Sequence, residues 1–197
     1  MISSKTFIVL DFKTTGFSAS SSIVSCSIVD QNGNVILDNL VKSSNYNHVL
    51  PIEGFHCINE EDIRERGISE VELFAKLSEI FEQYPYIVIY NAEFDKKFIP
   101  QNIKFQIPIY CAMDISIGFI NQHPSYQSIG QYLKLNCLAS LLDVNTMDLD
   151  LLTSLGDAEL CRRVWVEMLK PDHHLEIPFD DIITQYEHFK SEVYYDL

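Results

Sequence analysis

The sequence predicts a layered α/β or α+β fold, and two patterns along its 197 residues support this. Three β-rich segments come first, and strand-like and helix-like segments then alternate towards the C-terminal end. Apolar residues make up 47% and charged residues 21% of the chain, which is typical of a globular domain rather than a disordered one. The length suffices for one substantial hydrophobic core.

The N-terminal part predicts three consecutive strands. The apolar run at residues 7–10 ends directly at Asp11, which places a carboxylate at the end of a buried strand. Residues 23–30 and 34–41 are the next two β-rich runs, and Gln31-Asn32-Gly33 separates them. Asn-Gly tolerates the positive φ angles of a tight turn, so these two runs form a hairpin.

The middle of the chain predicts two helices. Residues 59–66 resemble a short helix that Gly67 ends, and Ser69 to Glu72 form a capping box that opens a longer helix to about residue 83. The apolar spacing predicts a buried face on this second helix: Val71, Phe74, Leu77, Ile80 and Phe81.

A second strand that leads to a carboxylate follows at residues 86–90. Asn91 turns the chain, Asp95 lies in the first turns of a helix, and Pro100 ends that helix. The remaining pattern predicts one short strand and four helices: residues 109–111, then 113–121, 129–142, 153–170 and 179–192.

Charge and cysteine content narrow the possible functions. The formal net charge of −14 counts against a protein that coats nucleic acid non-specifically, since such proteins neutralise phosphates with Lys and Arg. The five cysteines are scattered and form no CxxC pair, which is typical of reduced thiols in a cytoplasmic protein. No apolar run approaches the ~20 residues that span a bilayer, and the first residues lack a signal-peptide layout, so no membrane partner is expected.

Three acids stand out by position: Asp11 at a strand end, Asp95 after a second strand and Asp157 near the start of a long helix. Carboxylates that converge from distant segments are the ligands that Mg²⁺ or Mn²⁺ needs in a phosphoryl-transfer site. The alternative from spacing alone is that Asp95 and Asp157 stabilise helix N-termini.

The segments around these acids resemble the three motifs of the DnaQ-like, or DEDD, 3′→5′ exonuclease family. "VLDFKTTGF" is similar to D-x-E-T-T-G, "IYNAEFDKKFI" to H-N-A-x-F-D-x-x-F-L, and "LTSLGDAELCRRVW" to H-x-A-L-x-D-A. The stretches "HCINEEDIRERG" and "YCAMDIS" resemble intermediate landmarks of the family. The order of these motifs holds from about residue 6 to residue 170.

The resemblance implies a ribonuclease-H-like mixed sheet flanked by helices, with Asp11, Asp95 and Asp157 as catalytic metal ligands. It also implies a nucleic-acid 3′ end, of DNA or RNA, as the binding partner. We expect an exonuclease-like domain at 1–170 and an acidic C-terminal extension at 171–197, helical and packed on the same domain. The family's nucleotide-binding positions correspond to Thr14, Thr15, Gly16, Phe17, Asn91 and Phe94.

Two positions depart from the family pattern. Lys13 replaces the glutamate of the first motif, and Leu152 replaces the histidine that acts as general base. At ~4 Å and an effective dielectric of ~20, each unit charge pair is worth ~4 kcal/mol, so the change of two charge units weakens binding of Mg²⁺ or Mn²⁺. Loss of a general base costs roughly 10²–10⁴-fold in rate. The sequence therefore predicts weak or lost hydrolysis.

Three functions remain open on this basis. The first is a DnaQ-like domain that has kept binding of a nucleic-acid 3′ end or of a protein. The second is an active metal-dependent 3′→5′ exonuclease in which Lys13 neutralises the scissile phosphate and Glu93, Glu159 or a histidine serves as base. The third is a protein-interaction module. Because residues i and i+2 of a strand share a face, Lys13 is expected to form a salt bridge with Asp11 or Asp157.

Overall fold

The computed structural model describes residues 6–18, 20–43, 56–104, 107–122, 133–170, 181–182 and 184. Six strands of this part form one mixed sheet in the order β4-β3-β2-β1-β5-β6. The pairings β1–β2 and β2–β3 are antiparallel, whereas β1–β5, β5–β6 and β3–β4 are parallel. The strands are β1 Ile8–Thr14, β2 Ile23–Asp30, β3 Val35–Lys42, β4 Ile68–Ser69, β5 Ile87–Ile89 and β6 Ile109–Cys111.

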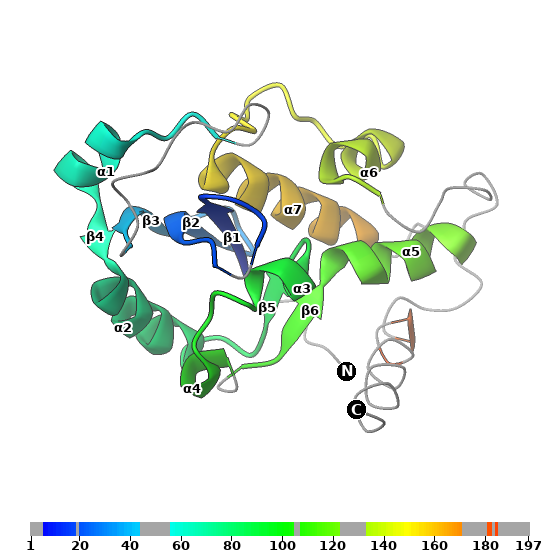
Figure 1. The fold of residues 1–197 in the computed structure, drawn as a ribbon. Helices are drawn as coiled ribbons and strands as arrows, with labels where there is room; N and C mark the ends of the chain where they lie inside the picture. The colour runs from blue at the N-terminus through cyan, green and yellow to red at the C-terminus, as the bar shows by residue number, and fades with distance from the viewer. Residues whose placement is uncertain are drawn as a thin grey trace.

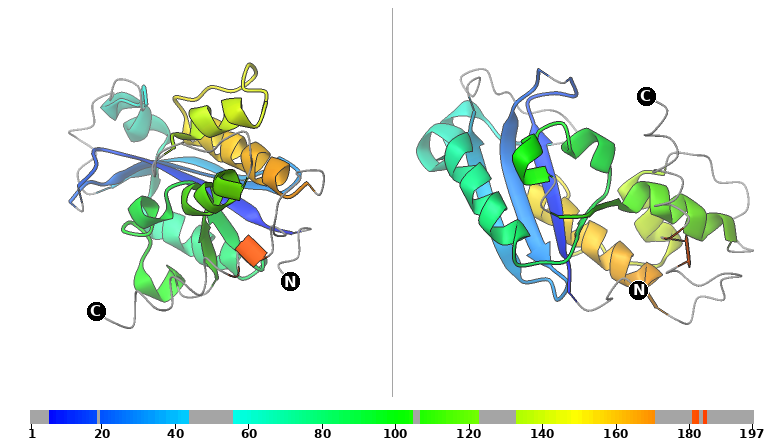
Figure 2. Two further views of the ribbon diagram at one scale, coloured as in Figure 1. Left: turned by 90° about the vertical axis from the view of Figure 1, so that its right-hand side faces the viewer. Right: turned by 90° about the horizontal axis from the view of Figure 1, so that it is seen from below.

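Helices cover both faces of the sheet (Figures 1 and 2). The helices are α1 Glu60–Arg66, α2 Glu70–Phe81, α3 Ala92–Asp95, α4 Gln101–Lys104, α5 Ala112–Gln122, α6 Leu135–Leu141 and α7 Ser154–Met168. One hydrophobic cluster joins the sheet to α5, α6 and α7, and a second joins the opposite face to α2 and α4. The predicted α/β class, with a mixed sheet flanked by helices, is confirmed. No helix of the described part is long and apolar enough to cross a membrane.

The central strand β1 is buried on both faces. Val9 belongs to the cluster on the α7 face, while Ile8, Leu10 and Phe12 belong to the cluster on the α2 face. This arrangement explains the continuous apolar run in the sequence, because a strand between two helical layers has no solvent face. Asp11 therefore stands in the middle of this doubly covered strand, which continues to Thr14, so the expectation that the strand ends at Asp11 was wrong.

The turn between β2 and β3 lies where it was predicted, but only one of its two predicted residues has a positive φ angle. Gly33 has φ +87°, whereas Asn32 does not have a positive φ. The carboxylate of Asp30 holds the loop, because it accepts hydrogen bonds from the backbone N–H groups of Asn32 and Asn34 at 2.8 and 2.9 Å. These hydrogen bonds lower the pKa of Asp30 although its burial opposes them.

Side-chain caps define the start of three helices. Ser69 caps α2, as the sequence predicts. Asn59 caps α1, and Thr153 caps α7 by accepting from the backbone N–H of Gly156 at 2.9 Å. Thr153 also donates to the carbonyl of Asp150 at 2.7 Å. The segment before α7 is therefore tied to the first turn of the helix that carries Asp157.

Several expectations need correction. Val71 is 80% exposed, and the buried residues of α2 are Leu73, Leu77 and Phe81, so the predicted apolar face was wrong at its first member. The helix of the second motif ends at Asp95, well before Pro100, and the short elements β4 and α4 were not predicted. Tertiary contacts rather than local pattern fix such short elements.

Two predicted helices extend beyond the described residues. Residues 129–132 of the helix predicted at 129–142 lie outside the described part. The described part of that helix, α6, begins at Leu135. The predicted helix at 179–192 also lies outside, except for residues 181, 182 and 184. Ile182 is buried in the same cluster as Phe119. The boundary at residue 170 stays a prediction.

The corrected face of α2 gives a matched pair of substitutions. Leu73→Ala removes a fully buried side chain and should lower the free energy of unfolding by ~2–5 kcal/mol. Val71→Ala, two residues earlier on the same helix, should leave the free energy within ~0.5 kcal/mol of the wild type. Urea unfolding of both variants measures this, and equal losses would contradict the observed orientation of the helix.

Candidate functional site

Three elements bring the predicted acids to one cavity of about 260 Å³. Asp11 comes from β1, Asp95 from α3 and Asp157 from the first turn of α7. The buried carboxylate of Asp95 accepts a hydrogen bond from the backbone N–H of Phe12 at 3.3 Å, which ties α3 to β1. The predicted convergence of the three aspartates is thus confirmed, although they lie 146 residues apart at the extremes, from position 11 to position 157.

Lys13 projects into the same cavity, as expected from its i+2 spacing to Asp11. Its Nζ lies 3.0 Å from Oδ2 of Asp11 and forms a second salt bridge with Oδ2 of Asp157. The Lys13 side chain is 8% exposed, against 21% for Asp11 and 27% for Asp157. The ammonium group therefore joins β1 to α7 from within the cavity.

Burial and mutual repulsion change the protonation of this cluster. Burial raises the pKa of Asp11 to about 7; Lys13 lowers it and Asp157 raises it further. Burial and the nearby Asp11 hold the pKa of Asp95 well above its ordinary value. Burial lowers the pKa of Lys13, but Asp11 and Asp157 outweigh that effect and raise it above the usual value. Lys13 is accordingly the fixed positive charge of the site.

The side chains present do not fit a two-metal centre. Divalent Mg²⁺ and Mn²⁺ require several oxygen ligands at ~2–2.6 Å, and here an ammonium group lies between two of the three carboxylates. Within the described residues, no three His, Cys, Asp or Glu side chains are grouped so that they could hold a metal ion. The charges that a metal would balance are already balanced in part by the chain itself.

His56 lines the cavity but is held as a structural group. Its Nδ1 accepts from the backbone N–H of Ile58 at 3.2 Å, so its Nε2 carries the proton and donates to the carbonyl of Thr14 at 3.2 Å. Burial is the main cause that lowers its pKa, which favours this neutral form. Because both ring nitrogens are engaged, His56 does not have the free lone pair that a general base needs.

Other candidate bases are engaged or lie elsewhere. Glu159 holds Arg162 at 2.6 Å and Arg163 at 2.8 Å, and Glu93 pairs with Lys96 at 3.5 Å. Leu152, at the position expected for histidine, is 38% exposed beside the cavity and offers no basic atom. The remaining histidines lie outside the described residues: His48, His123, His173, His174 and His188.

The aromatic side of the cavity is open to solvent. Phe17 is 60% exposed, and its ring centroid lies 6.3 Å from that of Phe94. Asn91 is exposed beside them. The cavity therefore combines a charged inner end with an aromatic rim, the kind of surface on which a nucleobase stacks.

The turn after β1 is closed by its own hydrogen bonds. Thr14 is buried and donates to the carbonyl of Gly16 at 2.7 Å, while the backbone N–H of Thr15 donates to the carbonyl of Ser22 at 2.9 Å. The backbone N–H of Thr15 is therefore used within the turn itself. Thr15 and Gly16 do not line the cavity, whereas Thr14 does.

Two neighbouring arginines of α7, Arg162 and Arg163, bind to other segments of the chain. Arg162 donates to the carbonyl of Gln31 at 3.1 Å, and Arg163 to Asp148 at 2.6 Å. Their side chains are only 14% and 23% exposed. Lys97 instead lies over the ring of Phe94, 5.8 Å from its centroid.

Sequence reasoning missed three features of the site. It did not find the positioning role of His56, although the residue opens the landmark stretch at 56–67. It did not find the contact of Leu135 with the cavity, since helix spacing shows a face but not its neighbour. Nor did it find the hydrogen bond from the Tyr90 hydroxyl to the carbonyl of Leu133 at 2.5 Å.

With this geometry established, comparison with solved structures identifies the fold class. Escherichia coli exonuclease I in complex with a dT13 oligonucleotide matches with a TM-score of 0.62 and 16% identity over 85% of this chain and 41% of that chain. Exonuclease I from Methylocaldum szegediense matches with a TM-score of 0.68 and 16% identity over 94% of this chain and 45% of that chain. An ExoI/SSB-Ct complex matches with a TM-score of 0.66 and 17% identity over 91% of this chain and 43% of that chain.

These similarities show the fold, and the chain spans less than half the length of the exonuclease I chains it matches. The ribonuclease-H-like mixed sheet expected from the motifs is confirmed in this way. No protein-family model matches the sequence, and no match was found among curated proteins.

The Lys13 salt bridges predict a measurable loss of stability. Lys13→Met keeps the aliphatic volume but leaves Asp11 and Asp157 without their cation, so the free energy of unfolding should fall by about 3 kcal/mol at about pH 8. The loss should shrink towards about pH 5, because the folded pKa of Asp11 lies above its unfolded value and protonation removes the repulsion.

Urea unfolding in metal-free buffer measures both effects. The matched control is Lys76→Met, since Lys76 pairs with Glu72 on the solvent face of α2 at 3.6 Å and should contribute less than ~1 kcal/mol. A loss for Lys13→Met that matches this control, or one that grows at low pH, would show that Lys13 does not compensate the aspartates.

Proposed function

We propose that the chain is a DnaQ-like 3′→5′ exonuclease-family domain that has weak or no hydrolytic activity and binds a nucleic-acid 3′ end. The observation that carries the proposal is the position of Lys13 Nζ between the carboxylates of Asp11 and Asp157. In this proposal Asp11, Asp95 and Asp157 are the family's metal positions, and the ammonium group takes the place of a divalent ion. The motif order and the fold shared with exonuclease I structures support the family assignment.

The proposed binding mode relies on the base more than on the phosphate. The ammonium group of Lys13 is already paired with Asp11 and Asp157, so the inner end has no free positive charge with which to attract a phosphate. A terminal base can instead stack on Phe17 and Phe94 at the open rim, and such stacking is sequence-tolerant. The proposal therefore favours a single-stranded end over a duplex.

Loss of hydrolysis follows from two absent groups. Lys13 weakens any binding of Mg²⁺ or Mn²⁺ at the aspartates, and Leu152 cannot take a proton from an attacking water. The alternative is an active exonuclease with an altered site, for which a histidine outside the described residues would have to act as base. A protein-interaction role is favoured by a different observation, the net charge of −14.

Oligonucleotide binding tests the proposed 3′-end site. Phe17→Ala should weaken binding of a single-stranded oligonucleotide by about 1–3 kcal/mol, or roughly 5- to 150-fold in Kd, since one stacking surface is removed. Fluorescence anisotropy with a dye at the 5′ end measures this. Met147→Ala, which removes a side chain that is 93% exposed outside the cavity, is the control and should have no effect.

A free 3′ end should be required for this binding. Blocking the 3′ end with the dye should abolish the signal, whereas blocking the 5′ end should not. Equal binding of both labelled oligonucleotides would refute recognition of a 3′ end.

Reversal of the two departures tests the loss of activity. Lys13→Glu should raise the affinity for Mn²⁺ by at least an order of magnitude, since it replaces a repelling cation with an oxygen ligand. Lys13→Glu combined with Leu152→His should then release mononucleotides from single-stranded DNA or RNA. Titration calorimetry measures the first effect, and a nuclease assay with Mn²⁺ measures the second.

Asp11→Ala in the doubly changed protein is the control and should abolish that activity. Unchanged metal affinity for Lys13→Glu would refute the role of Lys13. Mn²⁺-dependent activity of the wild type that Asp11→Ala removes would favour the alternative of an active enzyme.

A further inference from the structure

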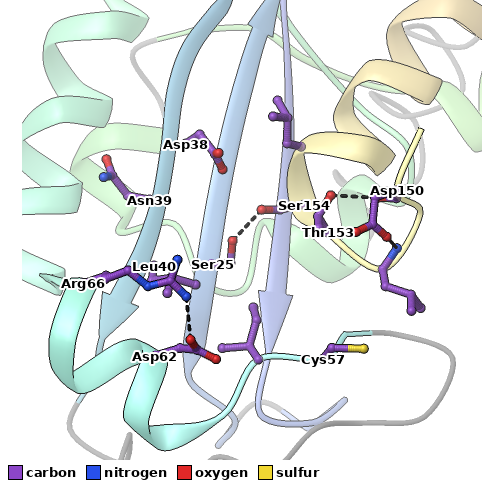
Figure 3. Close-up of a pocket in the computed structure, with 13 residues that line it drawn as sticks. Ser25, Asp38, Asn39, Leu40, Cys57, Asp62, Arg66, Asp150, Thr153 and Ser154 are labelled. Carbon is purple, nitrogen blue, oxygen red and sulfur yellow. Dashed lines mark hydrogen bonds and ion pairs between the residues drawn. The ribbon is translucent and has the colours of Figure 1, made fainter. Parts of the chain in front are cut away.

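A second cavity, of about 530 Å³, lies on the same face of the sheet as α7. Figure 3 shows that β2 and β3 form its floor, α1 one side and the start of α7 the other. We call it the α1–α7 groove, and six of the side chains that line it are Ser25, Asp38, Leu40, Asp62, Asp150 and Leu155. Its size falls within the ~300–1,000 Å³ of sites that enclose ligands of several residues or a drug-sized molecule.

A chain of buried hydroxyl groups fixes the polarity of the floor. Ser27 donates to Oδ1 of Asp38 at 2.8 Å, and Ser154 lies 2.7 Å from Ser27 and 2.5 Å from Ser25. Each hydroxyl has one proton. Since the proton of Ser27 goes to Asp38, the proton of Ser154 goes to Ser27 and that of Ser25 goes to Ser154. Ser25, only 5% exposed, therefore faces the groove as an acceptor.

Three carboxylates of the groove are further acceptors, and Arg66 is its one cation among the described residues. Asp62 pairs with Arg66 at 2.5 Å, but within the described part of the chain neither Asp38 nor Asp150 forms an ion pair. Asp150 uses Oδ1 to accept from the backbone N–H of Leu152 at 3.1 Å. Three carboxylates against one guanidinium leave two net negative charges in the groove.

The remaining lining includes the polar Asn39 and Thr153, and several apolar side chains. Leu40, Ile58 and Leu155 line the groove, and Leu152 at its edge is 38% exposed. These side chains suit the aliphatic stem of a lysine or arginine, whose charged end would reach the carboxylates. Apolar surface beside carboxylates that form no ion pair within the described residues is complementary to a cationic, amphipathic side chain.

We propose that the α1–α7 groove docks a basic, apolar segment of a protein partner, with Lys or Arg side chains at Asp38 and Asp150. A phosphate is disfavoured as the ligand because the groove has two excess negative charges. A bare metal ion is not the ligand, since no three metal-ligating side chains of the described residues are grouped to hold one. The proposal is independent of the proposed 3′-end binding.

The two exposed thiols provide a direct measurement in the full chain. Cys57 is exposed and lines the groove, whereas Cys26, Cys111 and Cys161 are buried. Cys137→Ser removes the other exposed thiol, so that an environment-sensitive dye can be attached at Cys57 alone. The probes are the peptide Leu-Lys-Leu-Lys-Leu, its counterpart Leu-Glu-Leu-Glu-Leu and a single-stranded oligo(dT).

The Lys peptide should change the dye signal with saturation, and the affinity should fall as salt rises. The double substitution Asp38→Asn with Asp150→Asn should weaken the affinity for the Lys peptide at least tenfold. The matched control is Glu79→Gln with Glu82→Gln, which removes two exposed carboxylates from the region of α2 outside the groove. This control should change the affinity for the Lys peptide less than twofold.

To allow for an effect of the dye, two-dimensional NMR of the unlabelled protein should show shifts at Leu40 and Leu155 with the Lys peptide. Failure of the Lys peptide to bind at ~1 mM, the weak limit of specific affinity, would overturn the proposal. So would equal binding of the Glu peptide, equal losses in the control variant, or oligo(dT) binding that depends on Asp38 and Asp150.

Discussion

The salt bridges of Lys13 are the interaction on which the candidate site depends. Burial makes the charged form of Asp11 and of Asp95 unfavourable, and the three aspartates repel one another. An ammonium group in contact with Asp11 and Asp157 offsets part of both costs and fixes the start of α7 against the end of β1. Because this cation belongs to the chain, part of the charge balance of the site is supplied by the chain itself.

This internal cation also restricts what the site can do. A metal ion can leave or be exchanged, whereas Lys13 is covalently attached and remains at its position in β1. A divalent ion that binds the aspartates must therefore displace the ammonium group or share carboxylates with it. The cavity has an aromatic rim and the buried Thr14 and His56, while at its inner end an ammonium group lies between two carboxylates.

The fold and the charged centre could be predicted because their signals are local in sequence. The apolar run before Asp11, the cap at Ser69 and the i, i+2 relation of Asp11 and Lys13 each act over a few residues. Val71 was misplaced because apolar spacing alone allows more than one face for an amphipathic helix. The neutral state of His56 and the serine chain below the α1–α7 groove depend on partners from other segments, such as Thr14 and Ser154, and no local pattern encodes them.

The segment from Asp150 to Asp157 connects the cavity and the α1–α7 groove. Thr153 caps α7 and donates to the carbonyl of Asp150, so the two aspartates at the ends of this segment are held in one rigid turn. Asp157 points to Lys13 and has its cation within the chain, whereas Asp150 faces the groove and forms no ion pair within the described residues. At one end of the turn Lys13 supplies the cation beside Asp157. At the other end, in the proposed docking, a Lys or Arg of the partner supplies the cation beside Asp150.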